Sequence, residues 1–171
     1  GIELIGDAIR EIMKSGTAMV MLGSGDKGLE DYIIERASPF RDRLSVITGY
    51  DDSLARRVYG GSDILLMPSR YEPCGLTQMI AMRYGTVPVA RNTGGLSDTI
   101  TDYDHLNGKG SGFLFKEYNP SAMVECLKRA LCLFMRHEDW GNLIKEVMTK
   151  DFSWKNSAQK YIRLFKFVME G

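Results

Sequence analysis

The stretch Ile64-Leu65-Leu66-Met67-Pro68-Ser69-Arg70-Tyr71-Glu72-Pro73-Cys74-Gly75-Leu76-Thr77-Gln78 determines the architecture of this chain. Its first four residues form an apolar run that predicts a buried strand, and the residues from Met79 to Tyr84 have a helical pattern. Proline and glycine between the two predict a sharp loop from the end of a strand into the start of a helix. Such a junction presents free backbone N–H groups and can hold a phosphate beside a hydroxylated group.

On both sides of this junction, short apolar runs alternate with amphipathic helical segments. Strands are expected at residues 18–22, 44–48, 64–67, 87–90 and 112–115. Helices are expected at residues 2–14, 29–36, 53–59 with Ser53 as the N-cap, 79–84, a short one from Gly94, and then 121–136, 137–150 and 154–169. This order predicts βαβ units, and therefore an α/β domain with a Rossmann-like parallel sheet flanked by helices.

The chain opens on a helix, with no strand before it. In a doubly wound sheet of strand order 3-2-1-4-5-6, the first strand of the domain is central. We therefore expect residues 1–171 to form a single domain whose sheet lacks its first, central strand.

Composition narrows the classes of function. The chain has 171 residues with 22 basic and 22 acidic side chains, so bulk charge favours neither a nucleic acid nor an anionic membrane as partner. No apolar run approaches the roughly 20 residues of a membrane span. Three cysteines cannot all pair, which favours a reducing compartment.

Glu72 is the first candidate for chemistry. It follows a strand, and open α/β sheets bind ligands at this carboxyl edge. The alternative is that Glu72 only stabilises the positive end of the next helix. Behind it, Gly75, Leu76 and Thr77 can offer N–H groups to a diphosphate, but a helix end supplies only about half a charge. Arg70 and Arg91 are candidates for the remaining positive charge, and either is equally well explained as a surface residue.

Two further segments follow predicted strands, so they are expected at the same carboxyl edge of the sheet. Tyr50 can stack on a nucleobase, and the alternative is a turn tyrosine packed on the rim of the sheet. The run Gly23-Ser24-Gly25-Asp26-Lys27-Gly28 matches the Gly-x-Gly-x-x-Gly pattern of dinucleotide binding. However, a helix precedes this run, and the next strand ends without the acidic residue that binds a ribose.

The motif Pro68 to Gln78 resembles the C-terminal half of bacterial-type glycogen synthases and plant starch synthases. The similarity covers essentially the whole chain and includes Gly49-Tyr50, Tyr84-Gly85-Thr86, Thr93-Gly94-Gly95-Leu96 and Phe152-Ser153-Trp154. Broader retaining glycosyltransferases of this shape carry a second glutamate where Ile80 stands here. In having Ile80 at that position and Gln78 before it, this chain is similar to the synthases that use ADP-glucose.

The resemblance implies the C-terminal domain of a GT-B glycosyltransferase, in which two Rossmann-like domains enclose the active site. Residues 1–171 would bind ADP-glucose, and the helix within 153–171 would cross back to an N-terminal domain that binds the α-1,4-glucan acceptor. Glucose would pass to the non-reducing end of the glucan with retention of configuration. The family suggests a bacterial cytoplasm or a plastid stroma as the location.

The resemblance also assigns roles to residues. Glu72 would be catalytic and hold the glucose hydroxyls. The donor-binding residues would be Gly23, Tyr50, Cys74, Gly75, Leu76 and Thr77. No metal and no cofactor besides the ADP-glucose donor are expected.

The resemblance places an arginine and a lysine that clamp the diphosphate just upstream of Gly1-Ile2-Glu3-Leu4. We therefore expect no glucosyl transfer by this polypeptide alone. Three alternatives stay open from the residues: a glycosyltransferase domain that uses UDP-glucose or another nucleotide sugar, an NAD-binding Rossmann domain, and a binding module without catalysis.

Overall fold

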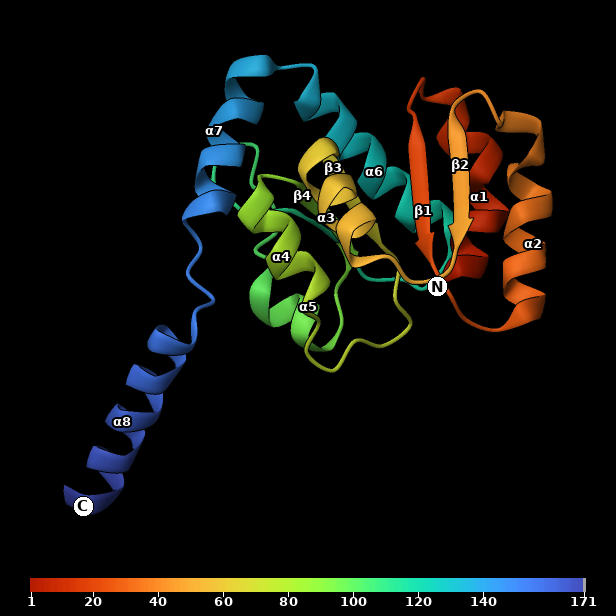
Figure 1. The fold of residues 1–171 in the computed structure, drawn as a ribbon. Coiled ribbons are helices and arrows are strands. Elements are labelled where there is room, and N and C mark those ends of the chain that lie inside the picture. Colours follow the sequence, from red (N-terminus) through yellow and green to blue (C-terminus); the bar gives the residue numbers. More distant parts are fainter. Residues whose placement is uncertain (171) are drawn as a thin grey trace.

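The computed structural model describes residues 1–170 and has the expected α/β architecture (Figure 1). The strands are β1 (Met19–Gly23), β2 (Leu44–Thr48), β3 (Ile64–Met67), β4 (Val87–Arg91) and β5 (Phe113–Phe115). The helices are α1 (Ile2–Lys14), α2 (Lys27–Ala37), α3 (Asp52–Gly61), α4 (Thr77–Tyr84), α5 (Gly94–Thr99), α6 (Pro120–Phe134), α7 (His137–Thr149) and α8 (Trp154–Glu170), with a 3-10 turn, η1 (Ser38–Phe40), after α2. Among residues 1–170, no helix combines the length and apolar character that crossing a bilayer requires.

The strands form two parallel sheets. β1 pairs with β2, and β3, β4 and β5 pair in that order. Within the described part of the chain, β1 and β3 share no hydrogen-bond ladder. A sheet of order 3-2-1-4-5-6 would hold its first strand between these two strands. The structure thus has a break at the place where the sequence predicts the lacking central strand.

The contacts at the two ends of helix α1 show that the strands of both sheets run in the same direction. At its start, a Cβ placed on Gly1 would overlap the carbonyl oxygen of Pro68, the residue that follows β3. At its end, the carbonyl oxygen of Met13 accepts a hydrogen bond of 3.2 Å from the side chain of Arg43, which precedes β2. Helix α1 therefore runs from the carboxyl end of β3 to the amino end of β2. The carboxyl ends of both sheets lie at one edge, where open α/β folds bind ligands.

The core is deepest around β4 and β5, which α6 and α7 cover. Val87, Val89 and Phe113 have no exposed surface. Helices α1, α2 and α6 pack side by side behind the strands, and α3 and α4 pack together in front of them (Figure 1). Helix α8 has no buried residue and extends away from the rest of the domain.

One helix start differs from the expectation. The sequence analysis names Ser53 as the N-cap of the third helix, but the N-cap is Asp51. Its carboxylate accepts a hydrogen bond of 2.9 Å from the N–H of Leu54. An aspartate and a serine are both good N-caps, so the pattern alone does not choose between neighbouring candidates.

We predict that Phe113→Ala lowers the free energy of unfolding by about 3–5 kcal/mol, because it empties a fully buried site of an aromatic ring. Urea denaturation would measure the change. Leu106→Ala is the control, since this side chain is 95% exposed and its loss is expected to change stability by no more than about 0.5 kcal/mol. Equal effects of the two substitutions would contradict the placement of the core.

Candidate functional site

The loop after β3 ends in backbone N–H groups that the protein leaves free. Gly75 has a φ of +71°, a left-handed conformation that suits glycine and turns the chain into α4. Leu76 is the N-cap and makes no side-chain capping bond. Within residues 1–170, the N–H groups of Gly75, Leu76 and Thr77 have no hydrogen-bond acceptor. These three groups, called the α4 amides below, therefore have no protein partner that a ligand would need to displace.

The first turn of α5 holds this loop from one side. The N–H of Gly95 donates a hydrogen bond of 2.9 Å to the carbonyl oxygen of Glu72. A Cβ on Gly94 would overlap that same oxygen, and a Cβ on Gly95 would overlap the carbonyl oxygen of Cys74. Both glycines are therefore needed for the close approach of two backbones. From the sequence, these glycines are expected only at the start of a helix and as part of the family resemblance, without this contact.

Gln78 holds the loop from the other side, and the sequence analysis did not identify it as a site residue. Its side chain has no exposed surface. The Nε2 atom lies 3.2 Å from the carbonyl oxygen of Cys74 and 3.1 Å from both the carbonyl oxygen of Gly75 and Oγ1 of Thr99. The Oε1 atom is buried without a partner, which costs free energy. A polar amide directly before the apolar residues Met79, Ile80 and Ala81 is the sequence signal that could have revealed this role.

The carboxylate of Glu72 is half-buried and takes part in no ion pair or side-chain hydrogen bond of the described residues. The two candidate cations are engaged elsewhere. Arg70 pairs with Glu3 at 3.2 Å. Arg91 donates hydrogen bonds to the carbonyl oxygens of Arg70 and Lys116. Both arginines therefore stabilise the edge of the β3–β4–β5 sheet, and their guanidinium groups already have protein acceptors.

Tyr118 lies at the centre of this arginine cluster. Its hydroxyl donates a hydrogen bond of 2.6 Å to Glu3, which is the main reason why the pKa of Glu3 falls to about 2. The guanidinium groups of Arg70 and Arg91 lie 4.9 Å and 5.3 Å from the centre of the Tyr118 ring. The cluster ties the start of α1 to the ends of β3 and β5.

Tyr50 and Gly23 lie together at the end of the other sheet. The N–H of Gly49 donates a hydrogen bond of 2.9 Å to the carbonyl oxygen of Gly23, which joins the ends of β1 and β2. Tyr50 is 88% exposed, so it does not pack on the rim of the sheet. The structure therefore brings the predicted residues together in two groups. Gly23 and Tyr50 end the β1–β2 sheet, and the segment 72–77 ends β3.

The glycine-rich run from Gly23 to Gly28 is a helix-capping turn. Asp26 caps α2 by accepting a hydrogen bond of 3.1 Å from the N–H of Leu29. A Cβ on Gly23 or Gly25 would meet no atom within 4 Å. The dinucleotide fingerprint uses its third glycine for close packing of the helix on the strand, whereas a Cβ on Gly28 would meet only the capping carboxylate of Asp26, at 3.1 Å.

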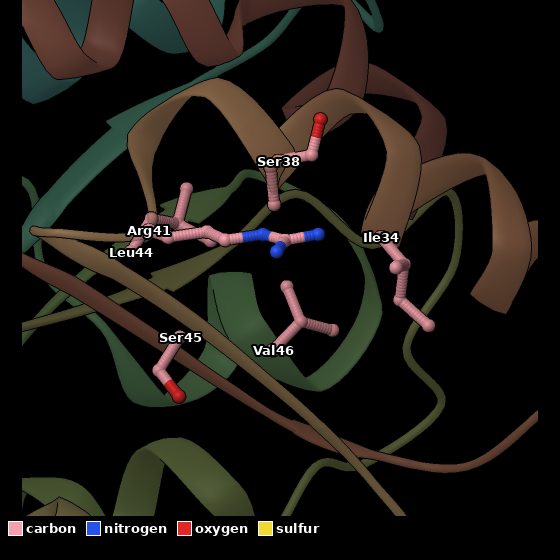
Figure 2. Close-up of a pocket in the computed structure, with 7 residues that line it drawn as sticks. Ile34, Ser38, Arg41, Leu44, Ser45 and Val46 are labelled. Carbon is pink, nitrogen blue, oxygen red and sulfur yellow. The ribbon is translucent and has the colours of Figure 1, made fainter.

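Two surface hollows lie apart from Glu72 and Tyr50. One, of about 330 Å³, lies between α2 and β2, and the side chain of Arg41 extends across it between Ser38 and Val46 (Figure 2). It contains no residue of the predicted site. The other, of about 610 Å³, lies beside α4 and is lined by Leu76, Met79, Ile80, Arg83 and residues 149–153.

The parallel strands and flanking helices define a Rossmann-type α/β domain. At the carboxyl edge of its sheets lie the carboxylate of Glu72 and the uncapped N-terminus of α4. Comparison with protein families makes this assignment specific. The model of the glycosyl transferases group 1 family matches residues 1–147. The chain belongs to this family.

The most similar proteins include two glycogen synthases and one starch synthase. The chain is 44% identical over 171 residues to the glycogen synthase of Desulforudis audaxviator and 42% identical over 170 residues to that of Bacillus cereus strain Q1. It matches the catalytic domain of starch synthase IV from Arabidopsis thaliana, solved with ADP and acarbose, at a TM-score of 0.87 and 35% identity. These alignments cover 99% of this chain but only 34–36% of the relatives. The chain therefore spans about a third of their length.

We predict that Gln78→Met destabilises the loop after β3. Methionine has a similar length but cannot donate to the carbonyl oxygens of Cys74 and Gly75. We expect the free energy of unfolding to fall by about 1–3 kcal/mol. Hydrogen exchange at the N–H of Gly95, which bonds to this loop, should become faster. Gln159→Met on exposed α8 is the matched control, and equal behaviour of the two variants would contradict the role of Gln78.

A second prediction concerns the pKa of Glu3. Because the folded-state pKa lies below the ordinary value of 4.5, Glu3 stabilises the fold above about pH 4.5, and this contribution is lost as pH falls towards 2. Tyr118→Phe removes the largest cause and should raise the pKa of Glu3 towards 4.5 in an NMR titration. The pKa of Glu11, lowered chiefly by Lys128, should not change. An unaltered pKa of Glu3 in the variant would refute this assignment.

Proposed function

We propose that this chain is the donor-binding domain of a retaining glucosyltransferase that moves glucose from ADP-glucose to the non-reducing end of an α-1,4-glucan. One observation carries the proposal: the α4 amides have no protein acceptor, and they lie in the same loop as Glu72, after the carboxyl end of β3. The names of the relatives support the reaction, and the ADP in the starch synthase structure supports the nucleotide of the donor.

The α4 amides would bind the diphosphate. A helix start combines unpaired N–H groups with about half a positive charge, so it favours an anion. As the bond to glucose breaks, negative charge grows on the leaving diphosphate, and donors that are already in place stabilise it without reorganisation. Cys74 lies in the loop that positions these donors. The carboxylate of Glu72, which has no partner among the described residues, would accept hydrogen bonds from the glucose hydroxyls.

The end of the β1–β2 sheet would bind the nucleoside. The exposed ring of Tyr50 offers a face for adenine, worth roughly 1–3 kcal/mol by analogy with stacking in nucleic-acid complexes. Gly23 lies beside it, and its missing side chain leaves open space where a base or ribose can enter.

The positive charge in this chain falls short of what a diphosphate needs. The helix start gives about half a charge, and Arg70 and Arg91 are engaged with protein acceptors. We propose that further cations and the glucan-binding N-terminal domain belong to parts of the enzyme outside these 171 residues. Helix α8 would reach that domain, since its apolar side chains Tyr161, Leu164, Phe165 and Val168 are all exposed and lie on one side of the helix.

An NMR titration with ADP tests the proposal. We expect the amide signals of Gly75, Leu76 and Thr77 to shift most, with UDP binding more weakly than ADP. Tyr50→Ala should weaken ADP binding by roughly 1–3 kcal/mol if stacking is lost. Tyr161→Ala on α8 is the matched control and should leave ADP binding unchanged.

Three outcomes would contradict parts of this proposal. Amide signals that millimolar ADP does not move would refute the donor site. Equal or tighter binding of UDP would favour the alternative of a UDP-sugar donor. Turnover of ADP-glucose by the 171-residue chain alone would refute the need for further domains.

A further inference from the structure

We propose that Gln78 and Thr99 are positioning residues for the diphosphate of the donor, because their side chains aim the N–H groups of Gly75 and Leu76 at the ligand. Gln78 has no exposed surface, so it acts on the ligand only through the loop. This inference rests on the proposed function, in which the α4 amides bind the diphosphate, and it adds the residues that set the direction of these amides.

The direction of a backbone N–H group follows from the partner of the carbonyl group in the same peptide unit. A peptide unit is planar, and in the trans form its C=O and N–H groups point in opposite directions. Every peptide bond within residues 1–170 is trans. The N–H of Gly75 therefore points away from the group that holds the carbonyl oxygen of Cys74. In the same way, the N–H of Leu76 points away from the group that holds the carbonyl oxygen of Gly75.

One side-chain amide holds both of these carbonyl oxygens. Nε2 of Gln78 lies 3.2 Å from the carbonyl oxygen of Cys74 and 3.1 Å from that of Gly75. Since one nitrogen atom binds both oxygens, the two carbonyl groups converge on it. The N–H groups of Gly75 and Leu76 are therefore turned to the opposite side of the loop.

The backbone conformation of the loop agrees with this direction. Gly75 has a φ of +71°, and Leu76 has a right-handed conformation with a φ of −106° and a ψ of −30°. Successive residues of opposite handedness form a concave row of N–H groups, which suits an anion. The helix itself directs the third N–H, that of Thr77, because the carbonyl oxygen of Leu76 accepts a hydrogen bond of 2.9 Å from Ile80. Gln78 thus aims the two amides that the helix does not.

Thr99 fixes the orientation of the Gln78 amide. Its Oγ1 atom donates a hydrogen bond of 2.6 Å to the carbonyl oxygen of Gly95 and accepts one of 3.1 Å from Nε2. The reverse orientation of the amide would place Oε1 against two carbonyl oxygens, which cannot donate. In the observed orientation, Oε1 is buried without a partner among the described residues, and a Cβ on Gly75 would lie 2.4 Å from it. The amide therefore occupies the space that any side chain at Gly75 would need.

Helix α5 relates the aimed amides to Glu72. The N–H of Gly95 donates a hydrogen bond of 2.9 Å to the carbonyl oxygen of Glu72, and Thr99 of the same helix holds Gln78. Donors that are in place before charge develops stabilise it without reorganisation. Loss of this support should therefore weaken binding of the diphosphate and leave the nucleoside contacts at the ends of β1 and β2 unchanged.

The ratio of the affinities for ADP and adenosine tests this inference, because only ADP carries the diphosphate. Gln78→Met keeps a similar side-chain length and removes both donors. We expect the preference for ADP over adenosine to fall roughly tenfold, which corresponds to one hydrogen bond to a charged group, with the affinity for adenosine unchanged. Calorimetric titration would measure both ligands at a temperature where circular dichroism shows each variant to be folded. Gln159→Met on exposed α8 is the matched control and should keep the preference.

Two substitutions of Thr99 provide an independent measurement. Thr99→Val keeps the shape of the side chain and removes the hydroxyl, so the preference for ADP should fall by roughly threefold. Thr99→Ser restores the hydroxyl and should return the preference to that of the unmodified chain. If Gln78→Met does not fold, this pair of variants decides the question alone.

The outcomes separate this inference from the proposed function. An unmodified chain that binds ADP no more tightly than adenosine would refute both. If that chain prefers ADP and the Gln78→Met and Thr99→Val variants keep the same preference, the two side chains only stabilise the loop, and the inference alone fails. Equal losses for ADP and adenosine, or a Thr99→Ser variant as weak as Thr99→Val, would also overturn it.

Discussion

The N–H groups at the start of α4 cannot be satisfied within the helix, and the described residues leave them without a partner. Every α-helix has such donors in its first turn, and many sequences cap them with Ser, Thr, Asp or Asn. Here Leu76 stands at the N-cap, and its side chain has no atom that can accept a hydrogen bond. Side-chain caps are present on α2, α3 and α6, where Asp26, Asp51 and Asn119 accept the hydrogen bonds, whereas α1, α5 and α7 lack one as α4 does.

An uncapped helix start needs support from outside the helix, and the loop after β3 receives it on two sides. Gln78 donates to the carbonyl oxygens of Cys74 and Gly75, while Gly95 donates to that of Glu72. These contacts fix the carbonyl groups of the loop and leave its N–H groups at residues 75–77 without a protein acceptor. The buried Oε1 of Gln78, which has no hydrogen-bond partner, lowers stability. Such local losses are typical of places where a fold serves binding.

Much of the fold was predictable because glycine and proline bound its apolar runs. The strand at 44–48 was placed at its observed residues, and the segment 72–77 was located from the proline and glycine of one motif. The support of that segment was not predictable. Gln78 and the pair Gly94 and Gly95 support the same loop only because the fold brings α5 against it, and local sequence patterns do not report such contacts. The ion pair of Arg70 with Glu3 likewise joins residues far apart in the chain.

The break in the sheet also separates the two halves of the site. Gly23 and Tyr50 end the β1–β2 sheet, whereas Glu72 and the α4 amides follow β3. One nucleotide sugar can contact both halves only if the sheets keep a fixed spacing. Within the described residues, α1 is the element that reaches both sheets, through Pro68 at its start and Arg43 at its end. The position of α1 against both sheets therefore sets the distance between the two halves of the candidate site.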